Sequence, residues 1–366
     1  MSNYEYDFLV FIGRFQPFHN GHKKVIDEAL GRSRRVIVLL GSSRQPKNMR
    51  NPWNDSQRAE MILNTYPGIN EGIIPDRPMA NSEFIIPGMQ DRLICSGIMD
   101  YPYCDNDDIW IAQVQRKVQS FVAIYGTNKS KIGLIGMSKD NSSYYLKLFP
   151  KWDSINVVQK VVYNATDVRN HYFSTFPVIN TNVLPDSTVT FLKKYLETTD
   201  FKYVLEEKMA VEKIRDRWKG SPYPPTFITT DAVVVQSGHI LLINRKHQPG
   251  KGLLALPGGY INESERLVDG MIRELREETG IKVPAPVLRG NIVLAKVFDD
   301  PNRSTRGRIV THAYHIALPP GELPKVKGSD DAEKAEWIPL SELTPENMFE
   351  DHYHIISNML GLTLVE

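Results

Sequence analysis

Between Gly259 and Ile281 the chain combines closely spaced charges with a regular apolar pattern. At about 100° per residue, Glu274 and Glu278 lie one helical turn apart, and Glu277 lies about 60° to one side of them. The opposite side of the same helix is apolar and consists of Leu267, Val268, Met271, Ile272 and Leu275. The pattern predicts an amphipathic helix over 267–279 that packs on a core and directs three carboxylates away from it.

Three carboxylates on one helix face repel one another. Their arrangement is better suited to a hard divalent cation, because Mg²⁺ prefers oxygen ligands. Arg273 precedes Glu277 by four residues and can orient that carboxylate. An acidic, solvated helix face is the alternative interpretation of the same residues.

The spacing of the whole segment is strict. Gly259 is followed after five residues by Glu265, and after seven more by the string Arg273-Glu274-Leu275-Arg276-Glu277-Glu278-Thr279-Gly280-Ile281. This string resembles the Nudix signature, G-x₅-E-x₇-R-E-U-x-E-E-x-G-U, without a departure. The resemblance implies metal-dependent hydrolysis of a nucleoside diphosphate linked to another group, with Glu274, Glu277 and Glu278 as metal ligands.

The Nudix resemblance also implies a cofactor and a general base. The expected cofactor is Mg²⁺, with Mn²⁺ as an alternative, and Glu277 and Glu278 are expected to take part in catalysis. The base in this family often comes from a later loop, and the sequence leaves three candidates open there: Asp330, Asp331 and Glu333.

A second segment of this half is rich in arginine. Residues 300–308 contain Arg303, Arg306 and Arg308, which suit a diphosphate, although a solvated basic loop is an alternative. Nudix domains that resemble this one are associated with ADP-ribose. The three arginines are therefore predicted to bind ADP-ribose.

The first half of the chain alternates short apolar runs with helical stretches, which predicts a parallel sheet with helices on both faces. The expected strands are Phe8–Ile12, Val36–Leu40, Arg92–Ile98 and Lys131–Ile135, and the expected helices are His22–Leu30, Ser56–Tyr66 and Asp107–Tyr125. The stretch from Pro67 to Gly88 is rich in Pro, Gly and Asn and is expected to be a long loop.

The segment from Gly13 to His22 follows the first strand and opens the first helix. Helix N-termini present unpaired N–H groups and attract phosphate. His19 and His22 are three residues apart, and Arg14 adds a cation. We call residues 13–22 the cradle, because they are expected to hold an anion; two unrelated surface histidines are the alternative.

The string Gly13-Arg14-Phe15-Gln16-Pro17-Phe18-His19-Asn20-Gly21-His22 contains the H-x-G-H motif of nucleotidyltransferases. In its longer form it resembles nicotinamide mononucleotide (NMN) adenylyltransferases of the archaeal type. The resemblance implies that His19, His22 and a later arginine, Arg169, act in catalysis. It also implies binding of ATP and NMN by Gly13, Arg14, Phe15, Asn51, Trp53, Arg58, Trp110, Gly136, Lys139, Asp140 and Thr166.

Three further segments resemble that family. Asn51-Pro52-Trp53 with Arg58 is similar to N-P-[FW]-x-x-x-x-R, residues 136–140 to G-H-x-K-D, and residues 165–169 to S-[ST]-x-x-R at a helix start. Met137 and Ala165 depart from the usual histidine and serine. Trp110 matches the aromatic residue that stacks on nicotinamide, with an ordinary core tryptophan as the alternative.

The implied reaction is in-line attack of the NMN phosphate on the α-phosphorus of ATP, which yields NAD and pyrophosphate without a covalent intermediate. Catalysis would come from positioning and from cations around the transferring group. His19, His22, Arg14, Lys139 and Arg169 would supply those cations or donors.

Composition limits the remaining choices. The 366 residues carry a formal net charge of +1, which argues against a chain that coats nucleic acid or an anionic membrane. Cys95 and Cys104 are the two cysteines, too few for a disulfide framework or a zinc ribbon. With no apparent signal peptide and no apolar run of membrane-spanning length, a cytoplasmic protein is expected.

We therefore expect an α/β protein: a Rossmann-like nucleotidyltransferase domain over residues 1–180, a helical linker over 181–225, and a Nudix α/β/α sandwich over 226–366. The expected substrates are ATP, NMN and ADP-ribose, and a homo-oligomer is left open. Two alternatives remain: the Nudix half could sense ADP-ribose without hydrolysing it, or the first half could adenylylate a flavin or pantetheine phosphate.

Overall fold

The computed structural model describes residues 4–69, 92–103, 107–137, 146–158, 164–329 and 331–362. The chain forms two compact units, Met1–Leu205 and Glu206–Glu366. Within the described residues, no helix is long and apolar enough to span a membrane.

The first unit is built on a five-stranded sheet in the order β3-β2-β1-β4-β5, and the strands of every neighbouring pair are parallel. The strands are β1 (Tyr6–Gly13), β2 (Ser33–Leu40), β3 (Leu93–Gly97), β4 (Ile132–Gly136) and β5 (Asp153–Asn156). The predicted parallel sheet is thereby confirmed. β5 was not predicted from the sequence, because Asp-Ser-Ile-Asn contains a single apolar residue.

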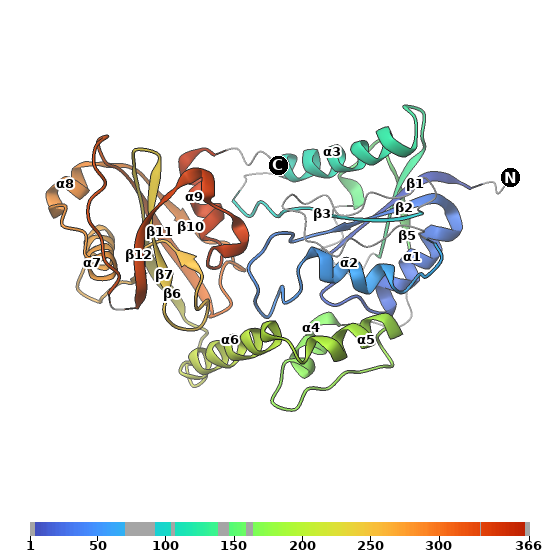
Figure 1. Ribbon diagram of the computed structural model, residues 1–366, viewed down its shortest axis with the longest axis horizontal. Coiled ribbons are helices and arrows are strands. Elements are labelled where there is room, and N and C mark those ends of the chain that lie inside the picture. Colours follow the sequence, from blue (N-terminus) through green and yellow to red (C-terminus); the bar gives the residue numbers. More distant parts are fainter. Residues whose placement is uncertain are drawn as a thin grey trace. The chain divides into compact units, whose positions relative to one another are not determined.

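Helices cover both faces of this sheet (Figure 1). Leu9 and Phe11 of β1 point to the face of α1 (Asn20–Arg32) and α2 (Asp55–Leu63), whereas Phe8 and Val10 point to the face of α3 (Asp108–Tyr125). This alternation follows from the two-residue period of a strand. The cradle begins at the carboxyl end of β1, which is the central strand of this sheet.

Three more helices follow: α4 (Ala165–Tyr172), α5 (Asp186–Tyr195) and α6 (Thr199–Asp216). The sequence assigns α5 and α6 to a linker. In the structure Leu192, Tyr195, Phe201 and Val204 are instead buried in the core of the first unit, and the unit boundary falls inside α6. The limits at 180 and 225 remain predictions about which parts fold alone.

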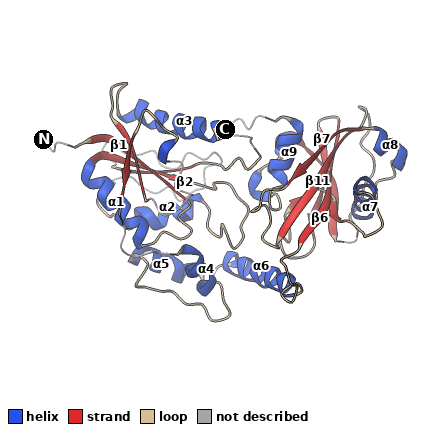
Figure 2. Ribbon diagram, turned by 180° about the vertical axis from the view of Figure 1, so that it is seen from behind, coloured by secondary structure: helices blue, strands red, loops and turns tan. Residues whose placement is uncertain are grey.

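The second unit contains a seven-stranded mixed sheet with the main order β10-β11-β6-β7-β12, in which β11 and β6 are parallel (Figure 2). Helix α7 packs on β6, β9 and β12, and α9 packs on β10 and β11, so helices lie on both faces. The elements are β6 (Thr226–Gln236), β7 (His239–Arg245), β8 (Leu254–Ala255), β9 (Gly258–Tyr260), α7 (Leu267–Thr279), α8 (Ala285–Gly290), β10 (Ile292–Phe298), β11 (Arg308–Ala317), β12 (Ala332–Pro339), two short 3₁₀ helices (Leu340–Glu342 and Pro345–Asn347) and α9 (His352–Leu360).

The hairpin predicted at Ser237-Gly238 is confirmed, with φ values of 49° and 74° at the two residues. Two positive φ angles are typical of a type I′ turn, whose twist matches that of the flanking strands. The short elements β8, β9 and α8 were not predicted, because two- to six-residue segments are too short to show a period. Most of the predicted 67–88 loop lies outside the described residues.

Two candidate active sites

The cradle is organised by its two histidines. His19 is the N-cap of α1, and its Nδ1 accepts hydrogen bonds from the N–H groups of Gly21 and His22, at 3.1 and 3.3 Å. The Nδ1 of His22 in turn accepts from the N–H of His19, at 3.3 Å. Because both Nδ1 atoms are acceptors, each neutral imidazole carries its proton on Nε2. The cradle therefore holds two Nε2–H donors on stacked rings whose centroids are 3.6 Å apart.

Aromatic packing fixes these imidazoles. Phe15 is buried, and its ring centroid lies 4.7 Å from that of His22. A Cβ at Gly13 would lie 3.1 Å from the Phe15 ring, so glycine lets this ring fold back under the cradle. Phe15, predicted to bind ATP or NMN, is thus placed where it supports the histidine.

Arg169 lies beside the cradle on α4. It donates to the carbonyl oxygens of Met49 (2.8 Å) and Gln16 (2.5 Å) and to the hydroxyl of Thr166 (3.2 Å). Its pKa is lowered to about 10, mainly by burial and also by the positive charges of Arg14 and Arg50. Three guanidinium groups thus share one region, an arrangement that suits a polyphosphate.

Two residues predicted to bind nucleotide are instead interior. Arg58 is 1% exposed, donates to the carbonyl oxygens of Arg14 (2.7 Å) and Gly41 (2.6 Å), and pairs with Asp55. Trp53 is also 1% exposed and packs among Tyr172, Phe173 and Tyr195. Arg58 thereby holds the backbone at Arg14 and Gly41.

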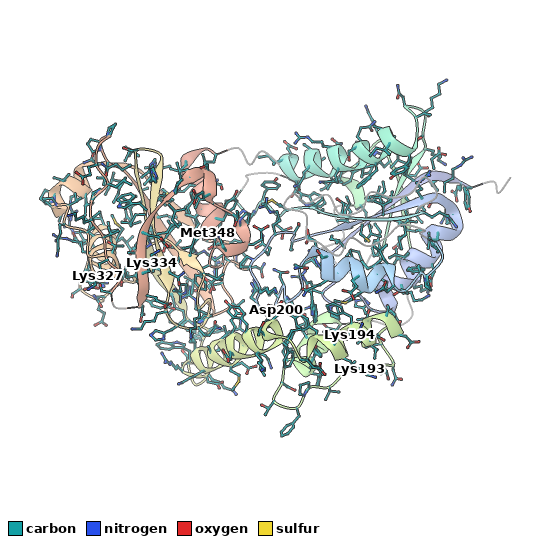
Figure 3. All side chains as sticks on the ribbon, in the orientation of Figure 1. Lys193, Lys194, Asp200, Lys327, Lys334 and Met348 are labelled. Atoms are coloured by element: carbon teal, nitrogen blue, oxygen red, sulfur yellow. The ribbon has the colours of Figure 1, made fainter. Side chains whose placement is uncertain are left out.

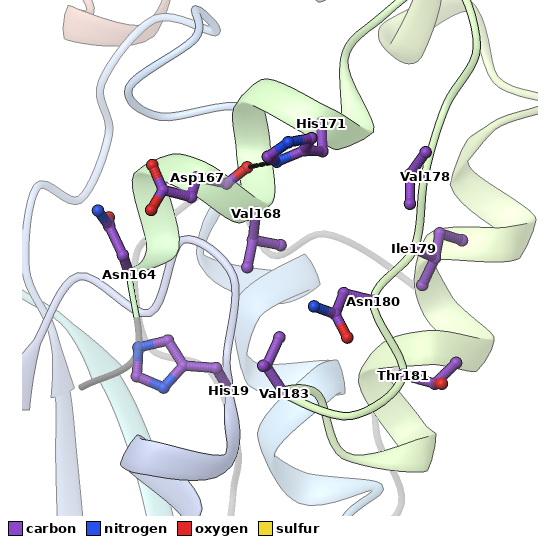
Figure 4. Close-up of a pocket in the computed structure, with 10 residues that line it drawn as sticks. All are labelled: His19, Asn164, Asp167, Val168, His171, Val178, Ile179, Asn180, Thr181 and Val183. Atoms are coloured by element: carbon purple, nitrogen blue, oxygen red, sulfur yellow. Dashed lines mark hydrogen bonds between the residues drawn. The ribbon is translucent and has the colours of Figure 1, made fainter. Parts of the chain in front are cut away.

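Helix α4 borders a cavity of about 550 Å³. Figure 4 shows this cavity between α4 and the 178–183 segment, with His19 at its edge. Asn164 caps α4, accepting from the N–H of Thr166 at 2.9 Å, and thereby fills the helix-start position next to Ala165. The sequence did not identify the other lining residues, because Asp167 and Val168 fill the unspecified positions of the 165–169 motif and the rest belong to no motif: His171, Val178, Ile179, Asn180, Thr181 and Val183.

The remaining predicted residues of this unit are spread around the sheet. Gly136 ends β4, and Asn51 has a buried Oδ1 without a hydrogen-bond partner in the structure. Trp110 is half-buried on α3, and its ring lies 6.2 Å from that of Phe149. Lys139 and Asp140 lie outside the described residues.

In the second unit, Glu278 is the buried member of the α7 glutamates. It is 5% exposed, and its Oε2 accepts from the N–H of Gly258 at 2.9 Å. Its pKa is raised to about 8, mainly by burial and also by the negative charges of Glu274 and Asp231, against the opposing Gly258 hydrogen bond and Arg245 charge. Burial in the fold thus disfavours the charged form of this carboxyl group.

Arg273 gathers the other carboxylates. It donates to Glu265 through two nitrogens (2.7 and 3.0 Å), to Glu274 (2.9 Å) and to Glu277 (2.8 Å). Its hydrogen bonds lower the pKa of Glu265 to about 2. A Cβ on Gly259 would lie 2.7 Å from Glu274 Oε1, so the signature glycine leaves room for that carboxylate.

The expected convergence of Glu274, Glu277 and Glu278 on one site is not what the structure shows. In the described part of the chain, no three His, Cys, Asp or Glu side chains are close enough together to hold a metal ion. Glu277 and Glu274 pair with Arg273, while Glu278 turns toward Gly258. The donor set nevertheless fits a hard cation, because it consists of carboxylate oxygens.

The arginines of the 300–308 segment have hydrogen-bond partners within the second unit. Arg303 forms a bidentate ion pair with Asp351 (2.8 and 2.9 Å), and Arg306 pairs with Glu350 at 2.9 Å. The Arg303–Asp351 pair is buried and Arg306 is half-buried, so these two arginines do not form a solvated loop. Binding of ADP-ribose by the three arginines stays a prediction. Arg308 is half-buried and donates to the carbonyl oxygen of Asp299.

The loop with the candidate bases is tied to the end of α7. Lys327 and Ser329 donate N–H groups to the carbonyl oxygens of Thr279 (2.8 Å) and Glu278 (3.2 Å), which satisfies acceptors that a helix end leaves unpaired. Figure 3 places Lys327 beside α7. Asp331 and Glu333 are exposed, and Asp330 lies outside the described residues.

Comparison with known proteins agrees with these two sites. Residues 225–359 match the NUDIX domain, and residues 10–81 match the cytidylyltransferase-like family. Over 208 residues the chain is 34% identical to the nicotinamide/nicotinic acid mononucleotide adenylyltransferase of Acinetobacter baylyi, covering 57% of this chain and 96% of that protein. Over 148 residues it is 34% identical to the ADP-ribose pyrophosphatase of Methanocaldococcus jannaschii, covering 40% of this chain and 81% of that protein.

A solved structure spans both units. The bifunctional NMN adenylyltransferase/ADP ribose pyrophosphatase of Francisella tularensis, complexed with AMP and a manganese ion, superposes with a TM-score of 0.85 at 33% identity, covering 97% of this chain and 99% of that one. This chain therefore belongs to the family of bifunctional NMN adenylyltransferase/ADP-ribose pyrophosphatases, in which a nucleotidyltransferase domain and a Nudix domain share one polypeptide.

Proposed function

We propose that the first unit transfers the adenylyl group of ATP to NMN, giving NAD and pyrophosphate. The observation that supports this best is the joint placement of two Nε2–H imidazole donors and the Arg14, Arg50 and Arg169 charges at the end of β1. Donors fixed before the reaction stabilise the charge that develops on the transferring phosphoryl group.

The cavity beside α4 is proposed to hold the adenosine of ATP. Val168, Val178, Ile179 and Val183 give it an apolar wall, and Asn180 adds an amide that can bond to a base or ribose. His19 at its edge would then face the phosphates. The catalytic roles of His19, His22 and Arg169 are part of this proposal, as are the ligand roles of the other predicted residues apart from the buried Trp53 and Arg58.

The acceptor is tested by product analysis. The chain is incubated with ATP and, separately, with NMN, nicotinic acid mononucleotide, flavin mononucleotide or pantetheine phosphate, and the dinucleotide formed is quantified. We expect NAD from NMN at the highest rate. A faster reaction with the flavin or the pantetheine phosphate would replace NMN as the substrate.

The second unit is proposed to hydrolyse ADP-ribose to AMP and ribose 5-phosphate. Glu274, Glu277 and Glu278 would hold Mg²⁺ or Mn²⁺, a cation that activates water and neutralises the diphosphate when bound. The carboxylate oxygens that α7 brings together, with Glu278 buried against Gly258, support a cation at this place. Asp331 and Glu333, together with Asp330, stay the candidate bases.

A sensor that binds ADP-ribose without hydrolysis is the competing function, and the presence of all three glutamates disfavours it. Hydrolysis is measured as AMP released from ADP-ribose with Mg²⁺, with Mn²⁺ and with EDTA. Release that depends on the cation supports the enzyme, whereas binding without release supports the sensor. A cytoplasmic location and the lack of nucleic-acid partners stay predictions.

A further inference from the structure

The segment that leads into α9 is bonded to the strand residues next to Glu278. Phe349 N–H donates to the carbonyl oxygen of Leu254 at 2.7 Å, and Leu256 N–H donates to Nδ1 of His352 at 2.9 Å. Two residues further on, Gly258 N–H donates to Glu278 Oε2. The 254–258 segment thus connects the first residue of α9 with a carboxylate of α7.

The side chain of His352 is itself held in place. It is 6% exposed, and burial together with the charges of Arg303, Arg245 and Arg306 keeps its pKa well below the usual range. A neutral ring has an Nδ1 lone pair for Leu256. The preceding residue, Asp351, is clamped by the bidentate pair with Arg303, which fixes the start of α9.

Resting on the proposed pyrophosphatase function, we propose that His352 is a positioning residue for Glu278, acting through the backbone from Leu256 to Gly258. Its acceptor atom sets where the Gly258 N–H points, and that N–H holds one oxygen of Glu278. The other side of the segment is anchored independently, because Ala232 N–H donates to the carbonyl oxygen of Pro257 at 2.8 Å. Loss of the His352 acceptor would therefore tilt the segment about that anchor.

Two substitutions of similar polarity separate this role from simple core packing. His352→Asn keeps an acceptor near the position of Nδ1, whereas His352→Gln moves the acceptor toward the position of Nε2. The glutamine variant leaves the buried Leu256 N–H without an acceptor, which is costly. We expect the asparagine variant to stay near the parent and the glutamine variant to weaken Mn²⁺ binding and ADP-ribose hydrolysis by roughly 10-fold each.

Binding of Mn²⁺ to the full chain is measured by the electron paramagnetic resonance signal of the free ion, with Glu278→Gln as the reference that lacks the site. Adenylyl transfer by the same samples reports that the first unit is folded, and hydrogen exchange in α7 reports on the second. Equal Mn²⁺ affinity in the asparagine and glutamine variants overturns the proposal. So does a glutamine variant whose second unit fails to fold, since His352 would then be structural.

The proposed pyrophosphatase function and the proposed role of His352 can be disproved separately. If the parent chain shows no Mn²⁺ binding that depends on Glu278 and no hydrolysis of ADP-ribose, the pyrophosphatase assignment is wrong. If the parent shows both and the two His352 variants do not differ, only the role of His352 is wrong.

Discussion

Two carboxyl side chains of the second unit, those of Asp231 and Glu278, are buried away from water. Asp231 is buried, its Oδ2 accepts from the Thr311 hydroxyl at 2.5 Å, and burial raises its pKa to about 6. The pKa of Glu278 is raised to about 8, and the negative charge of Asp231 contributes to that rise. Ionising such buried carboxyl groups is unfavourable in the metal-free fold, and a bound cation would stabilise their charged forms.

The raised pKa of Glu278 predicts how stability depends on pH. In the unfolded chain this group titrates near 4.5, and in the folded chain near 8. Between these values the folded state holds a proton that the unfolded state has lost, so stability falls as pH rises through this window. In the Glu278→Gln variant, this fall in the free energy of unfolding, on the order of a few kcal/mol, should be absent.

Hydrogen exchange in α7 at pH 5 and pH 8, corrected for the intrinsic rate, measures this effect in the full chain. The parent should lose protection at pH 8, the variant should lose less, and saturating Mg²⁺ should restore the parent. If parent and variant lose the same protection between pH 5 and pH 8, the titration of Glu278 is not the cause.

His22 offers a second test at this scale. His22→Asn keeps an acceptor for the His19 N–H but removes the Nε2–H donor, whereas His22→Ala removes both. Since the donor is the catalytic feature, both variants should lose NAD synthesis by about 10²–10³-fold. ADP-ribose hydrolysis in the same samples should not change. An asparagine variant within a few-fold of the parent would show that His22 acts through its hydrogen bond with the N–H of His19.

Among the elements, those with a long and clear pattern could be predicted from the sequence. The predicted bounds of α7 agree with the structure at both ends. Its amphipathic pattern runs through the whole helix, and the helix ends at Gly280, whose φ is 59°. The roles of Arg303 and Arg306 could not be predicted, because their partners Asp351 and Glu350 lie more than 40 residues away in the sequence. Arginine content alone does not distinguish a ligand site from a buried ion pair.

Helices α5 and α6 give a prediction at the scale of elements. Phe201 stacks on Phe173, at 5.3 Å between centroids, and Tyr195 donates to the carbonyl oxygen of Pro52 at 3.0 Å, next to Trp53. A fragment that ends at residue 180 loses these contacts and exposes their apolar partners. It should be insoluble or unfolded by circular dichroism, whereas a fragment that ends at residue 219 should fold. A cooperative melt of the shorter fragment would contradict this.

For the whole molecule, the two units provide separate cores and separate sites. Every contact described for the cradle lies within Met1–Leu205, and every contact described for Glu278 lies within Glu206–Glu366. The chain breaks its helical pattern at Ser221-Pro222-Tyr223-Pro224-Pro225, after the end of α6. This stretch is therefore the natural place to divide the protein.

A cut near Pro222 should yield two fragments that each keep one activity. The first contains α5 and α6 whole, so its core is complete, and it should form NAD at close to the parent rate. The second begins just before β6 and should release AMP from ADP-ribose with Mg²⁺. Mixing the fragments should change neither rate, since every contact described for each site lies within one unit. Loss of both activities in soluble, folded fragments, with recovery on mixing, would show instead that the two units complete each other's sites.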